Sequence, residues 1–227
     1  MSDRVILFDL DGTLVDTKPG IFSCVRKTAE ELGLPLPPDS RLVRFLGPPL
    51  ETGFLQVCGF TAEQTARAIP IYIGHYEAGG AYEARAFAGV APLLRILRRE
   101  GCTLAVATSK NERMAKLVLG HCGLLGLFDT VSGVPEGARG YTKKDSVLEA
   151  MRRLGAEAQK TVLVGDRKYD AVGAQQAGID AVGVLYGYGS REELEASPFR
   201  AVVRTPAGVG VYLRGRGGAN AVLPRKG

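Results

Sequence analysis

Two aspartates directly follow an apolar run near the N-terminus, and their types and spacing are the first sign of chemistry in the chain. The stretch FDLDGTLVDT occupies residues 8–17 and contains Asp9 and Asp11. Burying a carboxylate is costly unless it is paired or binds a metal. Residues i and i+2 of a strand point to the same side, so we expect these two carboxylates to act together at the end of a buried strand.

Three further polar residues follow apolar runs later in the chain. Thr108 ends one such run, and Asp166 and Asp170 follow another. In open parallel α/β sheets, ligands bind beyond the carboxyl ends of the strands, so all four aspartates and Thr108 are expected at one edge. Lys143 begins a helical pattern before the last of these strands and can reach the same edge.

Four acids with one nearby lysine would repel one another strongly, so we expect a cation among them. Oxygen ligands in this number suit Mg²⁺, which takes carboxylates together with substrate phosphate oxygens. With the metal screening the repulsion between two anions, one carboxylate can attack a phosphorus atom. A second carboxylate can protonate the leaving oxygen and later deprotonate water. The pattern therefore predicts Mg²⁺-dependent phosphoryl chemistry.

The elements that must position these residues read as an α/β fold. Short apolar runs predict buried strands at residues 4–9, 103–108, 130–133, 161–165 and 181–185, with a weaker sixth at 201–203. Helical patterns lie between most of them, at 91–100, 112–122, 144–154 and 171–177. Strands that alternate with helices indicate a Rossmann-like parallel sheet covered on both faces.

One connection is too long for a simple strand–helix–strand unit, which takes roughly 30 residues. The excess, residues 16–86, shows helical patterns and no strand pattern, so we expect an all-helical insertion rather than a structureless loop. The helical patterns lie at 20–32, 50–58 and 61–77. The expected division is a core of residues 1–15 and 87–213, a helical cap of 16–86 with hinges at 16–20 and 86–89, and a disordered tail of 214–227.

Composition and charge exclude several classes of protein. The chain has 227 residues, 45% hydrophobic and 23% charged, which is ordinary for a soluble domain. No window approaches the roughly 18 apolar residues of a membrane span, and no leader pattern is visible, so a cytoplasmic protein is expected.

The net charge is +5, of which +4 lies in the tail. The nearly neutral body argues against a nucleic-acid partner. Oligomeric state is not predicted.

The first two motifs resemble those of the haloacid dehalogenase superfamily of hydrolases. DLDGT matches motif one, and the resemblance implies that Asp9 is the nucleophile and Asp11 the general acid and base. VATSK matches motif two, in which Thr108 would bind a phosphoryl oxygen. Dehalogenases of this fold lack the second aspartate, so Asp11 argues against dehalogenation and favours a phosphatase.

The remaining motifs complete the resemblance. Motif three is the lysine of YTKKD, which is assigned to Lys143 with Lys144 as the alternative, because the proline that often follows this lysine is missing. Motif four is GDRKYD, which implies Asp166 as a Mg²⁺ ligand and Asp170 as a ligand or supporting acid. It also carries Arg167, an added positive charge beside the metal site. The resemblance further implies that the Asp9 side chain and the Asp11 main-chain carbonyl bind the metal.

The subfamily resemblance and the substrate are the least specific part of the interpretation. FLGPPLE at residues 45–51 and LYGYGS at 185–190 look most like phosphoglycolate phosphatases with a helical cap of the first type. The expected substrate is therefore a small phosphorylated metabolite, and Arg44 is a candidate contact, although a solvated helix face is the simpler interpretation. A sugar phosphomutase, a nucleotidase, a pyrophosphatase and a non-catalytic binding protein of the same fold stay open. G-x-G-x-x-G is missing after the first strand, which disfavours an oxidoreductase.

Overall fold

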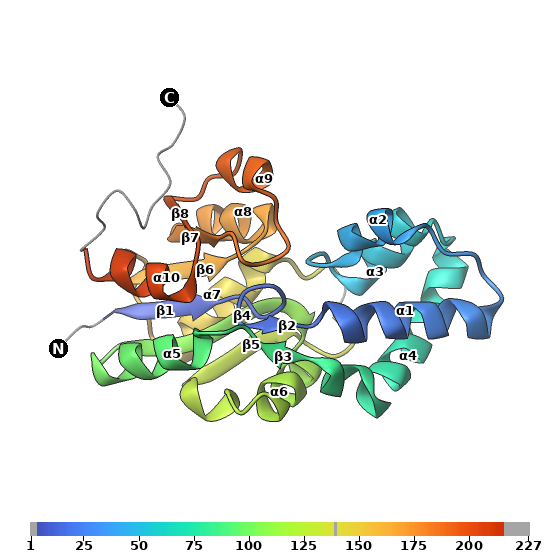
Figure 1. Ribbon diagram of the computed structural model, residues 1–227, viewed down its shortest axis with the longest axis horizontal. Coiled ribbons are helices and arrows are strands. Elements are labelled where there is room, and N and C mark those ends of the chain that lie inside the picture. The colour runs from blue at the N-terminus through green and yellow to red at the C-terminus, as the bar shows by residue number, and fades with distance from the viewer. Residues whose placement is uncertain (1–3, 139, 216–227) are drawn as a thin grey trace.

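The computed structural model describes residues 4–138 and 140–215. Its centre is a six-stranded sheet in the order β5-β4-β1-β6-β7-β8, and every neighbouring pair is parallel (Figure 1). The strands are β1 (Val5–Phe8), β4 (Thr103–Asn111), β5 (Thr130–Val134), β6 (Thr161–Gly165), β7 (Asp180–Val184) and β8 (Ala201–Val203). The predicted parallel α/β sheet is confirmed, including its weaker sixth strand.

Helices cover both faces of this sheet because side chains of each strand alternate between two hydrophobic clusters. On β1, Ile6 and Phe8 belong to one cluster, and Val5 and Leu7 to the other. The first cluster packs against α5 (Val90–Arg99), α6 (Glu112–His121) and α10 (Pro206–Leu213). The second packs against α7 (Lys143–Leu154), α8 (Lys168–Gln176) and the short α9 (Arg191–Glu195). The core therefore has three layers, with the ends of the strands left open between the helices.

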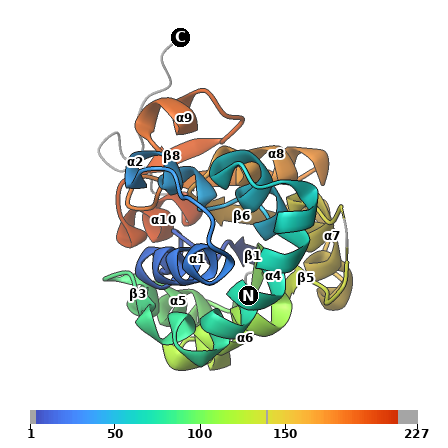
Figure 2. The same cartoon turned by 90° about the vertical axis from the view of Figure 1, so that its right-hand side faces the viewer.

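The long connection after β1 is mainly helical. It contains α1 (Lys18–Leu32), α2 (Asp39–Leu42), η1 (Val43–Phe45), α3 (Leu50–Thr52), the π-helix η2 (Gly53–Cys58), α4 (Ala62–Ala78) and η3 (Gly80–Glu83). We call residues 18–83 the helical segment. It lies at one end of the sheet in Figure 1, and Figure 2 shows α1 in front of β1. The first hydrophobic cluster continues from the sheet into this segment.

Two very short strands join the helical segment to the core. β2 (Val15–Asp16) pairs antiparallel with β3 (Arg85–Ala86), so the chain leaves and returns side by side. The expectation that no strand lies within residues 16–86 is wrong at these two ends. A two-residue strand has no periodicity, so the sequence carries no pattern that would indicate it.

Aromatic side chains form much of the interior of the helical segment. The rings of Phe45 and Phe54 meet edge to face at 5.1 Å, and Tyr72 and Tyr76 of α4 stack at 5.7 Å. Tyr72 and Tyr76 are fully buried. Helix α4 begins with a capping box in which Thr61 and Gln64 satisfy each other's main-chain N–H. This packing gives α4 a rigid face toward the core.

The C-terminal end of the described chain is held by an ion pair. Arg214 follows α10, and its Nε lies 2.7 Å from Oε1 of Glu100. The predicted disordered tail lies outside the described residues from position 216 onward. Among residues 4–138 and 140–215, no helix combines the length and the apolar character needed to span a membrane.

Candidate active site

A tight turn carries the chain from Asp9 to Asp11 at the end of β1. The main-chain N–H of Asp9 donates to the carbonyl of Val164 on β6 at 2.8 Å, which continues the sheet ladder by one residue. Gly12 then adopts a φ of 87°, which favours glycine. A Cβ at this position would lie 2.2 Å from Oδ2 of Asp166. The glycine of DLDGT is therefore required both for the turn and for the approach of Asp166.

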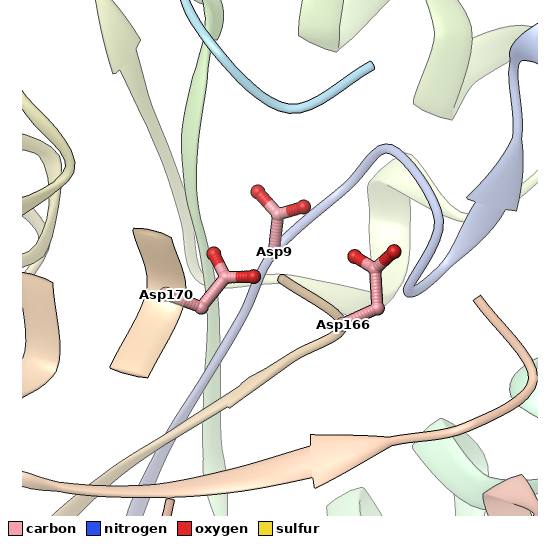
Figure 3. A group of neighbouring side chains, drawn as sticks. All are labelled: Asp9, Asp166 and Asp170. Atoms are coloured by element: carbon pink, nitrogen blue, oxygen red, sulfur yellow. The ribbon is translucent and has the colours of Figure 1, made fainter. Parts of the chain in front are cut away.

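Three of the four predicted acids form a compact cluster. Carboxylate oxygens of Asp9, Asp166 and Asp170 lie within 4.8 Å of one another, and all three residues are buried (Figure 3). Burial, with the nearby charges of Asp170 and Asp9, raises the pKa of Asp166 well above its usual value. Carboxylate oxygens gathered at one place are the type of hard donor that Mg²⁺ takes. The donor set of this structure therefore fits the expected cation.

Lys143 supplies the positive charge inside this cluster. Its Nζ lies 2.5 Å from Oδ1 of Asp9 and 2.7 Å from Oδ1 of Asp170, and the lysine is buried. Burial raises the pKa of Asp9 to about 7; Lys143 opposes this shift, and Asp170 and Asp11 add to it. Lys144 is exposed. Of the two candidate lysines, Lys143 is the one that the structure places among the acids.

Hydrogen bonds fix the orientation of the two later acids. The hydroxyl of Thr13 donates to Asp166 Oδ1 at 3.0 Å, and the main-chain N–H of Tyr188 donates to Asp166 Oδ2 at 2.7 Å. Asp170 Oδ2 accepts from the main-chain N–H of Arg167 at 2.9 Å. These bonds hold both carboxylates at the end of β6, as expected from the GDRKYD pattern.

Tyr188 also ties the core to the start of the helical segment. Its hydroxyl accepts from the main-chain N–H groups of Thr17 and Lys18, at 2.8 and 2.9 Å, and donates to Asp16 Oδ1 at 2.8 Å. The LYGYGS stretch therefore positions both Asp166 and the first turn of α1. The sequence indicates only a glycine-rich turn here, because hydrogen bonds between residues this far apart leave no local pattern.

Asp11 lies outside the acidic cluster and has its own partners. Its Oδ1 accepts from the hydroxyl of Thr17 at 2.5 Å, and Nζ of Lys110 lies 2.9 and 3.2 Å from its two oxygens. The Asp11 and Lys110 side chains are 12% and 8% exposed, so the pair is nearly buried. Lys110 Nζ also lies 4.7 Å from the ring centroid of Tyr76 on α4. Burial alone would lower the pKa of Lys110, but Asp11, Tyr72 and Asp9 together outweigh it and the pKa is raised.

Sequence reasoning missed Lys110, although the motif VATSK contains a usable signal. The strand β4 continues to Asn111, beyond the predicted end at Thr108. Lys110 lies two residues after Thr108 in the same motif and lines the same cavity, although the pairing of β4 with β5 is irregular between Ala107 and Asn111. Its main-chain N–H donates to the Thr108 hydroxyl at 3.1 Å, and the Thr108 carbonyl accepts from Ser146 at 2.7 Å.

A small cavity lies between these residues and the helical segment. Its volume is about 50 Å³. The core contributes Asp9, Asp11, Thr108 and Lys110 to its wall, and the helical segment contributes Ile21, Phe45, Leu50 and Tyr72. One end of the cavity is therefore charged and the other apolar. Leu50 of the FLGPPLE stretch faces the site, whereas Arg44 is exposed and lines neither this cavity nor the larger hollow beside it.

The Arg167 guanidinium has its partners outside the acidic cluster. Its Nε pairs with Oε1 of Glu193 at 2.9 Å, and its Nη1 donates to the carbonyl of Leu46. The guanidinium therefore connects the core to the start of the FLGPPLE stretch. The sequence predicts that Arg167 adds a positive charge beside the metal site. The structure shows that this charge is paired with the Glu193 carboxylate.

Comparisons with known proteins agree with this geometry. A family model described as haloacid dehalogenase-like hydrolase matches residues 6–184. A 5'-nucleotidase of Pseudomonas aeruginosa is 37% identical, covering 84% of this chain and 86% of that protein. The tyrosine-protein kinase PtkA of Mycobacterium tuberculosis is 38% identical over 86% of this chain, which spans 66% of the kinase. A phosphoglycolate phosphatase of Xanthomonas campestris pv. campestris is 32% identical, covering 82% of this chain and 84% of that protein.

Solved structures extend the same likeness. A haloacid dehalogenase-like family hydrolase from Streptococcus pneumoniae matches with a TM-score of 0.85 and 31% identity. The match covers 93% of this chain and 99% of the other. The likeness therefore includes the helical segment as well as the sheet.

Proposed function

The chain belongs to the haloacid dehalogenase-like hydrolases, and we propose that it hydrolyses small phosphomonoesters with Mg²⁺ through an aspartyl-phosphate on Asp9. The observation that carries the proposal is the position of the Asp9 carboxylate. It belongs to the acidic cluster, its Oδ1 lies 2.5 Å from Nζ of Lys143, and it lines the same cavity as Asp11. A nucleophile and a proton carrier thus face one space, in which a phosphoryl group would meet both.

The residues divide the reaction into two steps. An oxygen of Asp9 attacks the phosphorus of the ester, and the bond from phosphorus to the leaving oxygen breaks. Asp11 gives a proton to that oxygen and the alcohol leaves. Asp11 then accepts a proton from water as the water oxygen attacks the acyl phosphate, which releases inorganic phosphate and restores Asp9. Lys143 and the Thr108 hydroxyl stabilise the negative charge on the transferred group.

The metal site is part of the same proposal. Asp9, Asp166 and Asp170, with the main-chain carbonyl of Asp11, would hold Mg²⁺. When bound, the ion would supply positive charge that screens the repulsion between Asp9 and the phosphate. The hydrogen bonds from Thr13 and from the main chain of Tyr188 hold Asp166 ready for this role.

Residues 16–86 are proposed to act as a cap that closes over the substrate. Both connections to the core run through the β2–β3 pair, and the segment supplies the apolar half of the cavity wall. Closure excludes water and strengthens every electrostatic contact inside. The bond from Arg167 to the Leu46 carbonyl supports a closed position.

The chemical class of the ester has two candidates. The relative named as a phosphoglycolate phosphatase favours a small phosphorylated acid, and the more similar relative named as a 5'-nucleotidase favours a nucleoside monophosphate. The relative named as a tyrosine-protein kinase raises a further outcome, in which the phosphoryl group passes to an acceptor other than water. A phosphomutase would also transfer it to another hydroxyl.

The test measures both the ester consumed and the inorganic phosphate released. Purified protein with MgCl₂ is given p-nitrophenyl phosphate and a set of phosphorylated metabolites, with EDTA and the Asp9→Asn variant as controls. We expect equal amounts of ester consumed and phosphate released, and loss of both in EDTA and in Asp9→Asn. Undiminished activity in either control contradicts the proposal, and ester consumption without phosphate release indicates a transferase.

A further inference from the structure

A second, larger hollow adjoins the small cavity, and we call it the outer groove. Its volume is about 1100 Å³, at the upper end of the range for small-molecule sites, which is about 300–1,000 Å³. One wall comes from α3, η2 and α4 of the helical segment, and the other from the residues between β5 and α7 and from α8. The groove is therefore formed jointly by the segment and the core.

The groove and the small cavity adjoin each other. They share five wall residues, namely Gly47, Pro48, Leu50, Ser109 and Asn111. Lys143, whose Nζ lies 2.5 Å from Asp9 of the cavity wall, also lines the groove. Because the two hollows meet at Leu50, a leaving group too large for the small cavity would extend into the groove.

The walls of the groove combine apolar side chains with charged ones, among them Glu51, Lys144 and Lys168. Leu55, Ile69 and Ile73 line it from the helical segment. On the core side, Tyr169 and Val172 of α8 line it while 37% and 40% exposed, and they are among the few large hydrophobic side chains on the described surface that are this open. Exposed apolar side chains gathered in one hollow are more typical of a ligand site than of an ordinary solvent-exposed surface.

Two buried hydroxyls on α4, those of Thr65 and Tyr76, have no hydrogen-bond partner among the described residues, and Thr65 is the one that lines the groove. Thr65 lines the groove and is 2% exposed, yet its hydroxyl makes no hydrogen bond with any described residue. Leaving a buried hydroxyl unpaired is unfavourable, so a ligand with a hydrogen-bonding group would recover that loss. The other α4 residues that line the groove are Ala62, Ala66, Ile69 and Ile73, which favours a ligand whose face toward α4 is mostly apolar with one polar group.

We propose that the outer groove binds the leaving group of the substrate, and that this group is a ring-bearing alcohol of nucleoside size with a polar group that meets Thr65. The inference rests on the proposed phosphatase function and names its substrate class. It favours nucleoside monophosphates or similar ring-bearing esters over two- and three-carbon phosphorylated acids, which would leave the apolar walls of the groove uncovered.

The test compares kcat/KM for adenosine 5'-monophosphate with kcat/KM for 2-phosphoglycolate in wild type and two groove variants. Thr65→Val removes the unpaired hydroxyl and keeps the shape of the side chain. Val172→Glu places a charge on the apolar wall, at a helical position where Lys168 can pair with it. Leu148→Glu is the matched control, because Leu148 is also 40% exposed but lies on α7 outside the groove.

We expect the ratio of the two kcat/KM values to favour the nucleotide in wild type. The ratio should fall about three- to tenfold in Thr65→Val, the size of one hydrogen bond, and about tenfold or more in Val172→Glu. Leu148→Glu should leave it unchanged. A ratio that favours 2-phosphoglycolate, or that moves equally in Leu148→Glu, overturns the inference while leaving the phosphatase proposal intact.

Binding without turnover separates the two proposals. Calorimetric titration of adenosine into Asp9→Asn protein measures the groove whether or not any ester is hydrolysed. We expect saturable binding that Val172→Glu weakens about tenfold and that Leu148→Glu does not change. If adenosine does not bind, the groove inference fails even if esters are hydrolysed; if adenosine binds but no ester is hydrolysed, the proposed function fails instead.

Discussion

Replacing Asp166 by asparagine should stabilise the protein in the absence of metal. Carboxylate oxygens of Asp9, Asp166 and Asp170 lie within 4.8 Å of one another. Lys143 pairs with Asp9 and Asp170. Within the described ranges, no ion pair reaches Asp166. Asparagine keeps the shape of the side chain and can still accept the N–H of Tyr188, while the Thr13 hydroxyl can rotate to accept from the new amide.

The size of the effect follows from Coulomb's law. Two full charges no more than 4.8 Å apart repel by at least about 3.5 kcal/mol at an effective dielectric constant of about 20. Removing the charge of Asp166 would therefore relieve two such repulsions, about 7 kcal/mol or more, if all three acids were fully charged. The raised pKa of Asp166 means that metal-free wild type already relieves much of this by taking up a proton. We therefore expect Asp166→Asn to gain about 1–3 kcal/mol of unfolding free energy in EDTA.

Urea unfolding in EDTA and in MgCl₂ measures this effect. A ligand at 100 times its Kd stabilises by about 2.7 kcal/mol, so saturating Mg²⁺ should stabilise wild type by about this amount and Asp166→Asn by little. Asp180→Asn is the control, because the Asp180 side chain is 70% exposed and far from this cluster in the fold. A variant that is less stable than wild type in EDTA, or an equal Mg²⁺ response in both proteins, would refute the reasoning.

Three further outcomes check individual contacts. Lys143→Met should lower kcat by about 10²–10³-fold, while Lys144→Met, at an exposed position, should change it by less than about threefold. Steady-state kinetics of both variants on the same ester measure this difference. Tyr188→Phe removes a hydroxyl that joins two main-chain N–H groups to Asp16, and it should lower the unfolding free energy by about 1–3 kcal/mol in urea. Burial raises the pKa of the Cys58 thiol from 9.0 to about 11. Since only the thiolate reacts, its alkylation at pH 8 should be about a hundredfold slower than in unfolded protein and should rise as the pH approaches 11.

The sequence was most informative where local pattern decides structure. Continuous apolar runs such as VILF at residues 5–8 predicted the buried parallel strands. Because all parallel strands end at the same edge, the positions of Asp9, Thr108, Asp166 and Asp170 followed directly. The sequence does not distinguish Lys143 from Lys144. Their side chains lie on different sides of α7, and the sequence does not define the start of that helix to one residue.

The site contacts that the sequence does not predict are those between distant residues. Lys110 meets Asp11 across 99 positions, and the hydroxyl of Tyr188 meets Asp16 across 172. No periodicity records such a contact, because it forms only when distant strands and loops of the core come together. The pairing of Arg167 with Glu193 is a similar case. The sequence shows only that Arg167 stands beside a metal ligand, and this position predicts an effect of its charge on the metal site.

The covalent step at Asp9 is the central claim, and chemical trapping tests it most directly. Asp11→Asn protein, in which release of the phosphoryl group should be slow, is mixed with Mg²⁺ and a phosphoester, quenched and reduced with sodium borohydride. Borohydride converts an aspartyl-phosphate to homoserine, and mass spectrometry of the proteolytic peptides locates the change. The account predicts homoserine at position 9 only, and none when Asp9→Asn is added. An unmodified position 9 in protein that has consumed ester, or a trapped group on any other residue, would contradict it.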